Sequence, residues 1–439
     1  MIATLAKAGA ACMHRTRRQG EEPSMQYFRS GALAGLALGV AVAAAAAGAR
    51  AQEITLWTLN FANDSANQAF RSIIDQFQAA NPGVTVKVEN RGVDEHKSAL
   101  RVAAGSDQAP DIFFSWAGLG LGGEYIKSGL AAPMDKYYAE YKWDDEFLPA
   151  ALSFSRQYPG GRFGVPYTFH GEAVYYNKAL FAKAGITSEP KTYAELLAAA
   201  DRLAAAHIPA FTFGGTVNWH VMRLMDEILE TECGAATHDA LTNMKVSWAT
   251  EPCATKSFEE FHKWTSKYFL KPFMGIDQSQ SFNLFLAGRA AMMVEGDWLV
   301  GQLKGAGRLA DYALFPFPTG TQRLYGFAEY DYISSKSKHP DIAAKFLDYL
   351  GSTPVQQAHL GDFGSISVNR FVKYTSSEPM DLAWQRIFAE YRSTFVNGDQ
   401  AFPLAVTTEY FRVINQVASD RLAPKDAAAE LQKFISSAK

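Results

Sequence analysis

The chain has 439 residues, of which 48% are hydrophobic and 20% are charged, and its formal net charge at pH 7 is −3. Proteins that bind nucleic acid neutralise phosphates with clustered Lys and Arg. A mildly acidic chain without a basic stripe therefore argues against nucleic acid as a partner.

The first predicted element is a secretory signal peptide over residues 25–51. Arg29 precedes an apolar run over 31–48, and the small residues at 49–51 predict cleavage before Gln52. A membrane anchor is the alternative, because the run approaches the roughly 20 residues that span a bilayer. The Ala- and Gly-rich run and the cleavage-like site favour export, and with it a periplasmic location.

The rest of the chain is long enough for more than one core. Residues 1–24 are interpreted as an extension that results from starting translation upstream of Met25. Without residues 1–51 the chain keeps 388 residues and has a net charge of −7. This length accommodates two lobes with separate cores.

Two cysteines remain in that part of the chain, Cys233 and Cys253. An even number of cysteines in an exported protein favours a disulfide, and closing a loop of about 20 residues would stabilise the fold by roughly 3 kcal/mol. Two free buried thiols or a metal pair are the alternatives. His238 and His262 do not supply a recognisable metal-ligand spacing.

The first half of the exported chain predicts a parallel sheet. Strands, helices and strands alternate, and Asn81-Pro82-Gly83 ends the first helix. This order is typical of parallel strands joined by right-handed crossovers. Ligands bind at the carboxyl ends of such strands, where Trp57 and Trp116 lie. The predicted strands cover 54–61, 84–90 and 111–117, and the helices cover 65–80 and 96–106.

The second half repeats the alternation without long Pro- or Gly-rich linkers or internal repeats. We therefore expect the chain to cross between the lobes on strands, which would form a hinge. A capped helix is predicted to open near Thr192. The predicted segments are a strand running into a helix over 172–186, strands at 209–215, 290–298, 310–318 and 326–335, helices at 191–208, 258–270, 280–290 and 339–352, and a mostly helical tail from 354.

Several segments together resemble one known family. The matching pieces are PDIFF followed by Trp116, GGEYIKSGLAAPM, GVPY, YYNKALFAKAGI, EPKTYAELLAAADRL, FLAGRAAMMVEGDW, FPFPTG and ISSKSKHPDIAAKFLDYL. In this order they resemble the periplasmic solute-binding proteins of ABC-type importers, in the sugar-binding class (extracellular solute-binding protein family 1) that includes maltose- and glucose-binding proteins. The resemblance spans essentially the whole chain after residue 51.

The resemblance implies an α/β, two-lobed Venus-flytrap fold that closes on a ligand. Each lobe would be a mainly parallel sheet flanked by helices, with three hinge crossovers between the lobes. Carried over by position, one lobe would comprise 52–169 plus 319–365, and the other 170–318 plus 366–439. Residues 1–51 would be the extension and the cleaved signal peptide.

A sugar ring has apolar C–H faces and a hydroxyl rim, so its site needs flat aromatic groups and planar donors and acceptors. By position in the family, the expected stacking residues are Trp298, Trp116, Trp57 and Trp219, with core packing as the alternative. The expected hydrogen-bonding residues are His170, Asp331, Asn397, Asp399 and Glu172, with Glu329 as a substitute for Asp331 and a hinge salt bridge as the alternative role for Glu172.

The expected ligand is a small neutral sugar. The sequence GLGL at 118–121 stands where the maltose-binding branch carries charged oligosaccharide contacts, which favours a smaller sugar, either a monosaccharide such as glucose or a disaccharide. We expect a monomeric receptor without catalytic activity, cofactor or metal, which passes its sugar to a membrane permease.

Other classes of protein remain as alternatives. A secreted glycosidase would need two carboxylates across one bond, for which Glu172 and Asp331 are candidates, but the chain has no G-x-S-x-G, H-E-x-x-H or Walker motif. A receptor for glycerol phosphate or another anion would need Arg in the cleft, and the candidate segments are poor in Arg. A ferric receptor needs paired tyrosines, whereas Tyr175 and Tyr176 are adjacent on a strand and point to opposite faces.

Overall fold

The computed structural model describes residues 52–61, 63–391 and 393–438. The predicted extension and signal peptide lie outside the described residues. No helix in the described part of the chain is both long and apolar enough to cross a membrane. Residues 51–439 form one unit, which contains all the elements below.

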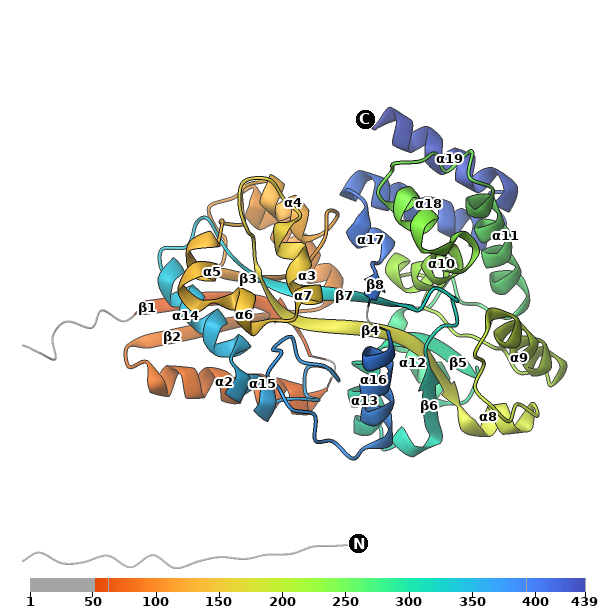
Figure 1. The fold of residues 1–439 in the computed structure, drawn as a ribbon, viewed down its shortest axis with the longest axis horizontal. Coiled ribbons are helices and arrows are strands. Elements are labelled where there is room, and N and C mark those ends of the chain that lie inside the picture. The colour runs from red at the N-terminus through yellow and green to blue at the C-terminus, as the bar shows by residue number, and fades with distance from the viewer. Residues whose placement is uncertain (1–51, 62, 392, 439) are drawn as a thin grey trace, which may run out of the picture. The chain divides into compact units, whose positions relative to one another are not determined.

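The strands of this unit form one mixed sheet in the order β2-β1-β3-β7-β4-β5, with β6 paired to β4 and β8 paired to β7. Strands β1, β2 and β3 are parallel, and β3 pairs antiparallel with β7. Figure 1 shows β4 and β7 running side by side, and their pairing is antiparallel. The strands are β1 Gln52–Leu59, β2 Val84–Arg91, β3 Ile112–Trp116, β4 Val165–Asn177, β5 Met292–Gly296, β6 Tyr312–Phe315, β7 Arg323–Ile333 and β8 Ser393–Phe395.

The second lobe differs from the expected parallel sheet. Val174 of β4 pairs antiparallel with Val294 of β5 and with Phe315 of β6. Strands β5 and β6 therefore run parallel to each other on opposite edges of β4, which runs the other way after crossing from the first lobe. The predicted strand 209–215 is reduced to isolated bridges at Phe211.

The helices form where the sequence supplies caps and an apolar face. Asn63 caps α2 by accepting the Ala66 N–H at 2.9 Å. Thr192 and Glu195 form the capping box that opens α9, which confirms the predicted start. The helices around the first core are α2 Asp64–Ala80, α3 Val93–Ala104, α4 Gly122–Lys127, α5 Asp135–Tyr141, α6 Trp143–Glu146, α7 Pro149–Leu152, the 3₁₀ helix Ser153–Arg156, α14 Pro340–Gly351 and α15 Thr353–Ala358.

The remaining helices belong to the second lobe. They are α8 Lys178–Lys183, α9 Tyr193–Ala205, α10 Asn218–Thr242, α11 Pro252–Lys267, α12 Gln278–Leu286, α13 Leu299–Gly305, the 3₁₀ helix Leu309–Asp311, α16 Pro379–Glu390, α17 Gly398–Ala401, α18 Leu404–Ala418 and α19 Pro424–Ser437.

Each lobe has its own buried core. The first lobe's core gathers side chains of β1, β3, α2 and α14, including Phe77 and Phe346. The second lobe's main core gathers side chains of α10, α11 and α18, including Trp264 of α11, together with Trp248 from the connection between α10 and α11. A smaller core surrounds Trp384. Separate cores joined by few strands are what a hinged molecule requires.

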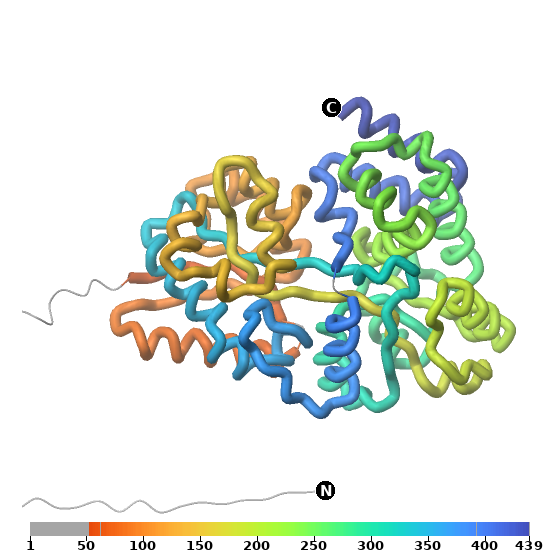
Figure 2. Tube along the Cα trace, viewed as in Figure 1, coloured from red at the N-terminus to blue at the C-terminus, as the bar shows by residue number. Residues whose placement is uncertain are grey.

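The chain passes from one core to the other on β4 and β7. On β4 the first core ends at Phe169 and the second-lobe cores begin at Ala173. On β7 the change falls between Leu324 and Ala328, and Figure 2 shows that both strands continue without a break. A third change falls between residues 368 and 380. The expected lobe limits at 169/170, 318/319 and 365/366 stay predictions.

The predicted disulfide is present. Cys233 of α10 and Cys253 of α11 are bonded, with Cα atoms 5.1 Å apart. The bond ties the C-terminal half of α10 to the start of α11. In the described residues no group of three His, Cys, Asp or Glu side chains is placed to hold a metal ion.

Candidate functional site

A cavity of about 420 Å³ lies between the two lobes. Its lining combines side chains that pack against the first core, among them Trp116 and Tyr167, with Trp219, which packs against the second core. The volume lies within the range of small-molecule sites, roughly 300 to 1,000 Å³. Six of the predicted site residues line it, namely Trp298, Trp116, His170, Trp219, Asn397 and Asp399.

Trp298 owes its position to the glycine two residues earlier. Strand β5 ends at Gly296, and a Cβ there would lie 2.0 Å from the Trp298 ring. The indole therefore rests on the glycine backbone, at the start of α13. The ring is half-buried and its centroid lies 5.1 Å from that of His170. One side of Trp298 is thus packed while the other lines the cavity.

Trp116 and Trp219 line the same cavity from different lobes. Trp116 ends β3, with Phe114 edge-on at 5.0 Å and the Lys97 ammonium 4.8 Å from its ring centroid. Trp219 lies in the first turn of α10, and its buried indole N–H has no hydrogen-bond partner among the described residues. Both rings are half-buried, so each can contact a ligand.

Arg223 lies one helical turn after Trp219, on the same face of α10. Its guanidinium lies 4.6 Å from the ring centroid of Trp219 and 5.1 Å from that of Trp298. Arg223 also pairs with Glu172, at 2.9 Å, and with Glu295. Two acidic side chains therefore flank this buried cation and hold it against both indole rings, so that it offers no free charge.

The two acids around Arg223 differ in protonation. Burial raises the pKa of Glu172 to about 8, although Arg223 opposes this shift. For Glu295 burial is also the largest single influence and favours the neutral form, but Arg223, His220 and Gln278 together outweigh it and lower the pKa. Gln278 adds a hydrogen bond to Glu295 at 2.8 Å. Near neutral pH Glu295 is therefore the permanent counter-ion.

His170 is held between two carboxylates at the cavity wall. Its Nδ1 lies 2.6 Å from Asp297 and its Nε2 lies 3.2 Å from Glu329. Burial alone would lower the pKa of His170, but Asp297 and Glu329 raise it to about 10. Asp297 also accepts the Ser365 N–H at 2.5 Å. His170 is thus an imidazolium with both N–H groups occupied, and it orients Glu329.

Three predicted residues lie outside the cavity lining. Trp57 packs beneath the Arg91 guanidinium, 4.1 Å from its ring centroid. Glu172 lies behind Arg223, where it forms the ion pair that was its alternative role. Asp331 is buried further along β7, where burial first and Glu329 second raise its pKa to about 7. Glu329, the expected substitute for Asp331, lines the cavity.

Several buried polar atoms of the lining have no partner among the described residues. A buried polar atom without a partner is costly and uncommon, so such a group points to a ligand that completes it. The atoms are the Tyr167 hydroxyl, the Trp219 indole N–H, and the side-chain carbonyl oxygens of Gln302, Asn397 and Gln400.

Sequence reasoning missed Lys97, Tyr167 and Arg223. The sequence analysis did not predict α10, on which Arg223 lies one turn after Trp219, and without that helix nothing placed the two side chains on one face. Tyr167 lies three residues before His170 on the same strand, and nothing in the sequence distinguishes it from the neighbouring aromatics. Lys97 reaches the cavity from α3. The rule that ligands bind at the carboxyl ends of parallel strands points to strand ends and does not indicate a side chain on a helix.

Comparison with known proteins identifies the family. Residues 62–357 match the family described as bacterial extracellular solute-binding protein. The chain belongs to this family. A search of solved structures found a chitin oligosaccharide binding protein that superposes with a TM-score of 0.80 at 22% identity, over 88% of this chain and 98% of that one. This likeness confirms the predicted two-lobed fold.

Curated relatives cover most of the chain. An uncharacterised ABC transporter extracellular-binding protein of Pyrococcus horikoshii is 25% identical over 383 residues, 85% of this chain and 84% of the relative. A maltotriose-binding protein of Pyrococcus abyssi is 26% identical over 310 residues, 69% of this chain and 63% of the relative.

Proposed function

We propose that this solute-binding protein is an exported receptor that holds a small neutral sugar in the cavity between its lobes and delivers it to an ABC-type importer. The names of the relatives support this class of ligand and partner, since they include an ABC transporter binding protein, a maltotriose-binding protein and a chitin oligosaccharide binding protein. The predicted signal peptide would export the chain with cleavage before Gln52.

One observation carries the proposal. Three indole rings, of Trp116, Trp219 and Trp298, line one cavity together with buried polar atoms that have no partner in the described part of the chain. Indole faces match the C–H faces of a sugar ring, and the free amide oxygens, hydroxyl and indole N–H match its hydroxyl rim. A purely apolar ligand would leave those polar atoms unpaired, at a cost of about 1–3 kcal/mol each.

The charges of the cavity favour a neutral ligand over a phosphate. Arg223 is balanced by the ionised Glu295, with Glu172 also beside it, and His170 lies between Asp297 and Glu329. Neither cation therefore offers the unbalanced positive charge that a phosphate ligand would require.

A second candidate, glycerol phosphate or another small anionic solute, rests on Lys97. Among the described residues no carboxylate lies within 4 Å of its ammonium, and burial lowers its pKa. A single ammonium can serve a phosphate, but it equally donates to sugar hydroxyls. The carboxylates of Asp297, Glu329 and Asp399 in the same lining oppose an anion.

The size of the site suits one ring, with room for a second. A neighbouring cavity of about 460 Å³ shares Lys97, Leu121, Trp219 and Asp399 with the first. A monosaccharide such as glucose would fill the first cavity, and a disaccharide would extend past these four side chains. A ligand that contacts groups of both lobes would favour a closed form, because only differential contacts shift such an equilibrium.

The glycosidase alternative loses its candidate pair. Glu172 is engaged by Arg223 and lies outside the cavity lining, as does Asp331. A retaining or inverting mechanism needs two carboxyl groups that face the same glycosidic bond. We therefore propose binding without turnover.

A thermal-shift and tryptophan-fluorescence screen of residues 52–439 tests the function. The panel would hold glucose, galactose, xylose, mannose, maltose and glycerol phosphate. The proposal expects a saturable shift with at least one neutral sugar and recovery of that sugar unchanged. A shift with glycerol phosphate alone would select the second candidate, and release of product from a disaccharide would select the enzyme.

A further inference from the structure

The segment 397–402 contacts the cavity and both lobes at once. Asn397, Asp399 and Gln400 line the cavity, and Phe402 is buried in the second core. The carbonyl oxygen of Gln400 accepts the Leu119 N–H of the first lobe at 2.7 Å. A backbone hydrogen bond between the lobes therefore lies directly beside side chains that the ligand would contact.

Two glycines of the first lobe make this contact possible. Gly118 and Gly120 flank Leu119. A Cβ on Gly120 would lie 2.4 Å from the carbonyl oxygen of Asp399, and a Cβ on Gly118 would lie 2.5 Å from that of Gln400. Real Cβ atoms do not approach so closely, so any side chain at either position would force the segment away. The sequence GLGL is thus a docking strip for the segment 397–402.

Asp226 holds the segment from the other side. Its carboxylate accepts the Gly398 N–H at 2.8 Å, the Tyr325 hydroxyl at 2.6 Å and the Tyr410 hydroxyl at 2.8 Å. The side chain is 2% exposed and does not line the cavity. An ionised carboxylate only accepts hydrogen bonds, and these three donors occupy three of its roughly four acceptor sites. Gly398 lies between Asn397 and Asp399, and its anchoring therefore fixes both.

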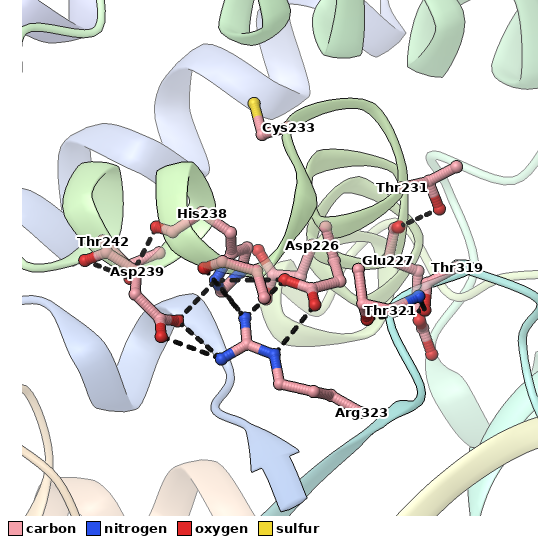
Figure 3. Close-up of polar contacts among 12 residues, drawn as sticks. Asp226, Glu227, Thr231, Cys233, His238, Asp239, Thr242, Thr319, Thr321 and Arg323 are labelled. Atoms are coloured by element: carbon pink, nitrogen blue, oxygen red, sulfur yellow. Dashed lines mark hydrogen bonds and ion pairs between the residues drawn. The ribbon is translucent and has the colours of Figure 1, made fainter.

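Helix α10 is attached to β7 independently of Asp226. Arg323 of β7 donates to Glu230 at 2.6 and 2.9 Å and to Asp239 at 2.8 and 2.9 Å, and Figure 3 shows Arg323 beneath the polar face of α10 that also carries Asp226. Loss of Asp226 would therefore release the segment 397–402 while the helix stays in place.

We propose that the segment 397–402 is a latch between the lobes that couples ligand contact to closure, with Asp226 and Gly120 as the positioning residues on its two sides. This inference rests on the proposed function for its ligand. On one edge the latch presents the side chains of Asn397, Asp399 and Gln400 to the sugar. On its other edge the Gln400 carbonyl oxygen accepts the Leu119 N–H of the first lobe. Neither positioning residue lines the cavity that the first sugar ring would occupy.

A merely structural role for these residues makes a different prediction. Structural damage would lower the melting temperature and leave the affinity of the folded fraction unchanged. A latch instead predicts loss of order confined to 397–402 and weaker binding at temperatures where the variants are fully folded. Hydrogen exchange of the ligand-free protein reads the first effect without any sugar.

The test compares variants on both sides of the latch. Asp226→Ala removes the hydrogen bond to the Gly398 N–H, and Gly120→Ala forces the segment away from the first lobe. Each variant should speed exchange of the 397–402 amides at least about tenfold. Each should also weaken binding of the tightest-binding neutral sugar of the panel about tenfold or more. Asp226→Asn keeps one oxygen for the Gly398 N–H and should fall between Asp226→Ala and the unaltered protein. If Asp226→Ala does not fold, Asp226→Asn replaces it in the test. The latch then predicts that the 397–402 amides of Asp226→Asn exchange at least about threefold faster than those of the unaltered protein.

Tyr312→Phe and Gly105→Ala are the matched controls. The first removes a buried hydroxyl that donates to the Phe285 carbonyl oxygen, outside the latch, and the second adds a Cβ that meets nothing closer than 3.8 Å. Both should keep exchange and affinity within about twofold. Unchanged exchange at 397–402 in Asp226→Ala and Gly120→Ala, or equal changes in the controls, would overturn the latch. Failure of the unaltered protein to bind any sugar would overturn the proposed function. The exchange data would still show whether Asp226 and Gly120 position the segment 397–402.

Discussion

At the scale of single residues, the cavity is lined by side chains that other protein groups hold in place. Arg223 holds the rings of Trp219 and Trp298, and His170 holds Glu329. The sugar-facing groups therefore need no reordering on binding, which lowers the entropy cost of association.

Truncation of Trp298 tests its proposed contact with the ligand. Trp298→Ala should weaken sugar binding at least about tenfold, since it removes one face of the site. The melting temperature of the ligand-free protein should change by no more than about 4 °C, because the ring is only half-buried. Isothermal titration and a thermal melt measure both, with Trp298→Phe as the partial-rescue control. A large loss of stability with unchanged affinity would assign Trp298 to the core.

The charged state of His170 predicts a dependence of stability on pH. Its pKa is about 10 in the folded protein and 6.5 in the reference state. A raised pKa contributes stability that is complete below pH 6.5 and is lost as the pH rises through 10. The stability difference between the unaltered protein and His170→Gln should therefore shrink by at least about 1.4 kcal/mol between pH 7 and pH 10.5, one pKa unit. Urea unfolding at the two pH values measures it, and a constant difference would contradict the imidazolium.

At the scale of elements, the sequence predicted the strands that lead to Trp116 and Trp298 and the start of α9, but it did not predict α10 or which side chains reach the cavity. Trp116 and Trp298 follow strands, as ligand-facing residues do in α/β sheets. Glu329 and Asp331 share one face of β7 because side chains alternate along a strand, so the pattern alone cannot say which of them borders the cavity. Lys97 reaches the cavity from α3, and Asp226 acts through a segment 172 residues away.

The turn after β5 gives a prediction at this scale. Gly296→Ala should displace the indole of Trp298, because the added Cβ would lie 2.0 Å from its ring. We expect at least about tenfold weaker sugar binding, read by titration. Gly305→Ala in α13 meets no atom within 4 Å and should keep full affinity. Equal affinity of both variants would show that the glycine does not seat the indole.

The disulfide joins the C-terminal half of α10 to the start of α11, and neither cysteine lines the cavity. Replacing both Cys233 and Cys253 by Ser should lower the free energy of unfolding by about 2–4 kcal/mol, because the bond closes a loop of 20 residues. Chemical denaturation measures the loss. Sugar affinity should stay within about twofold, since neither residue lines the cavity. A change in affinity without a change in stability would contradict this purely structural role.

At the scale of the whole molecule, the strands β4 and β7 continue from one lobe into the other. The cavity lies where the side chains of these strands stop packing in the core of the first lobe and begin packing in the second. Sequence order predicted the two lobes and their crossing on strands. It did not predict that β4 would serve as a central strand with antiparallel neighbours, because pairing direction depends on how the chain returns from the first lobe. His170 of β4 and Glu329 of β7 lie on these shared strands, so the hinge and the site are one region.

The most direct test is a structure of the protein with the tightest-binding neutral sugar of the panel. The account predicts an intact sugar ring between the lobes, with one face on Trp298 and its hydroxyls on Asn397, Gln400 or Glu329. A saccharide bound elsewhere, or an empty cavity at saturating sugar, would contradict it.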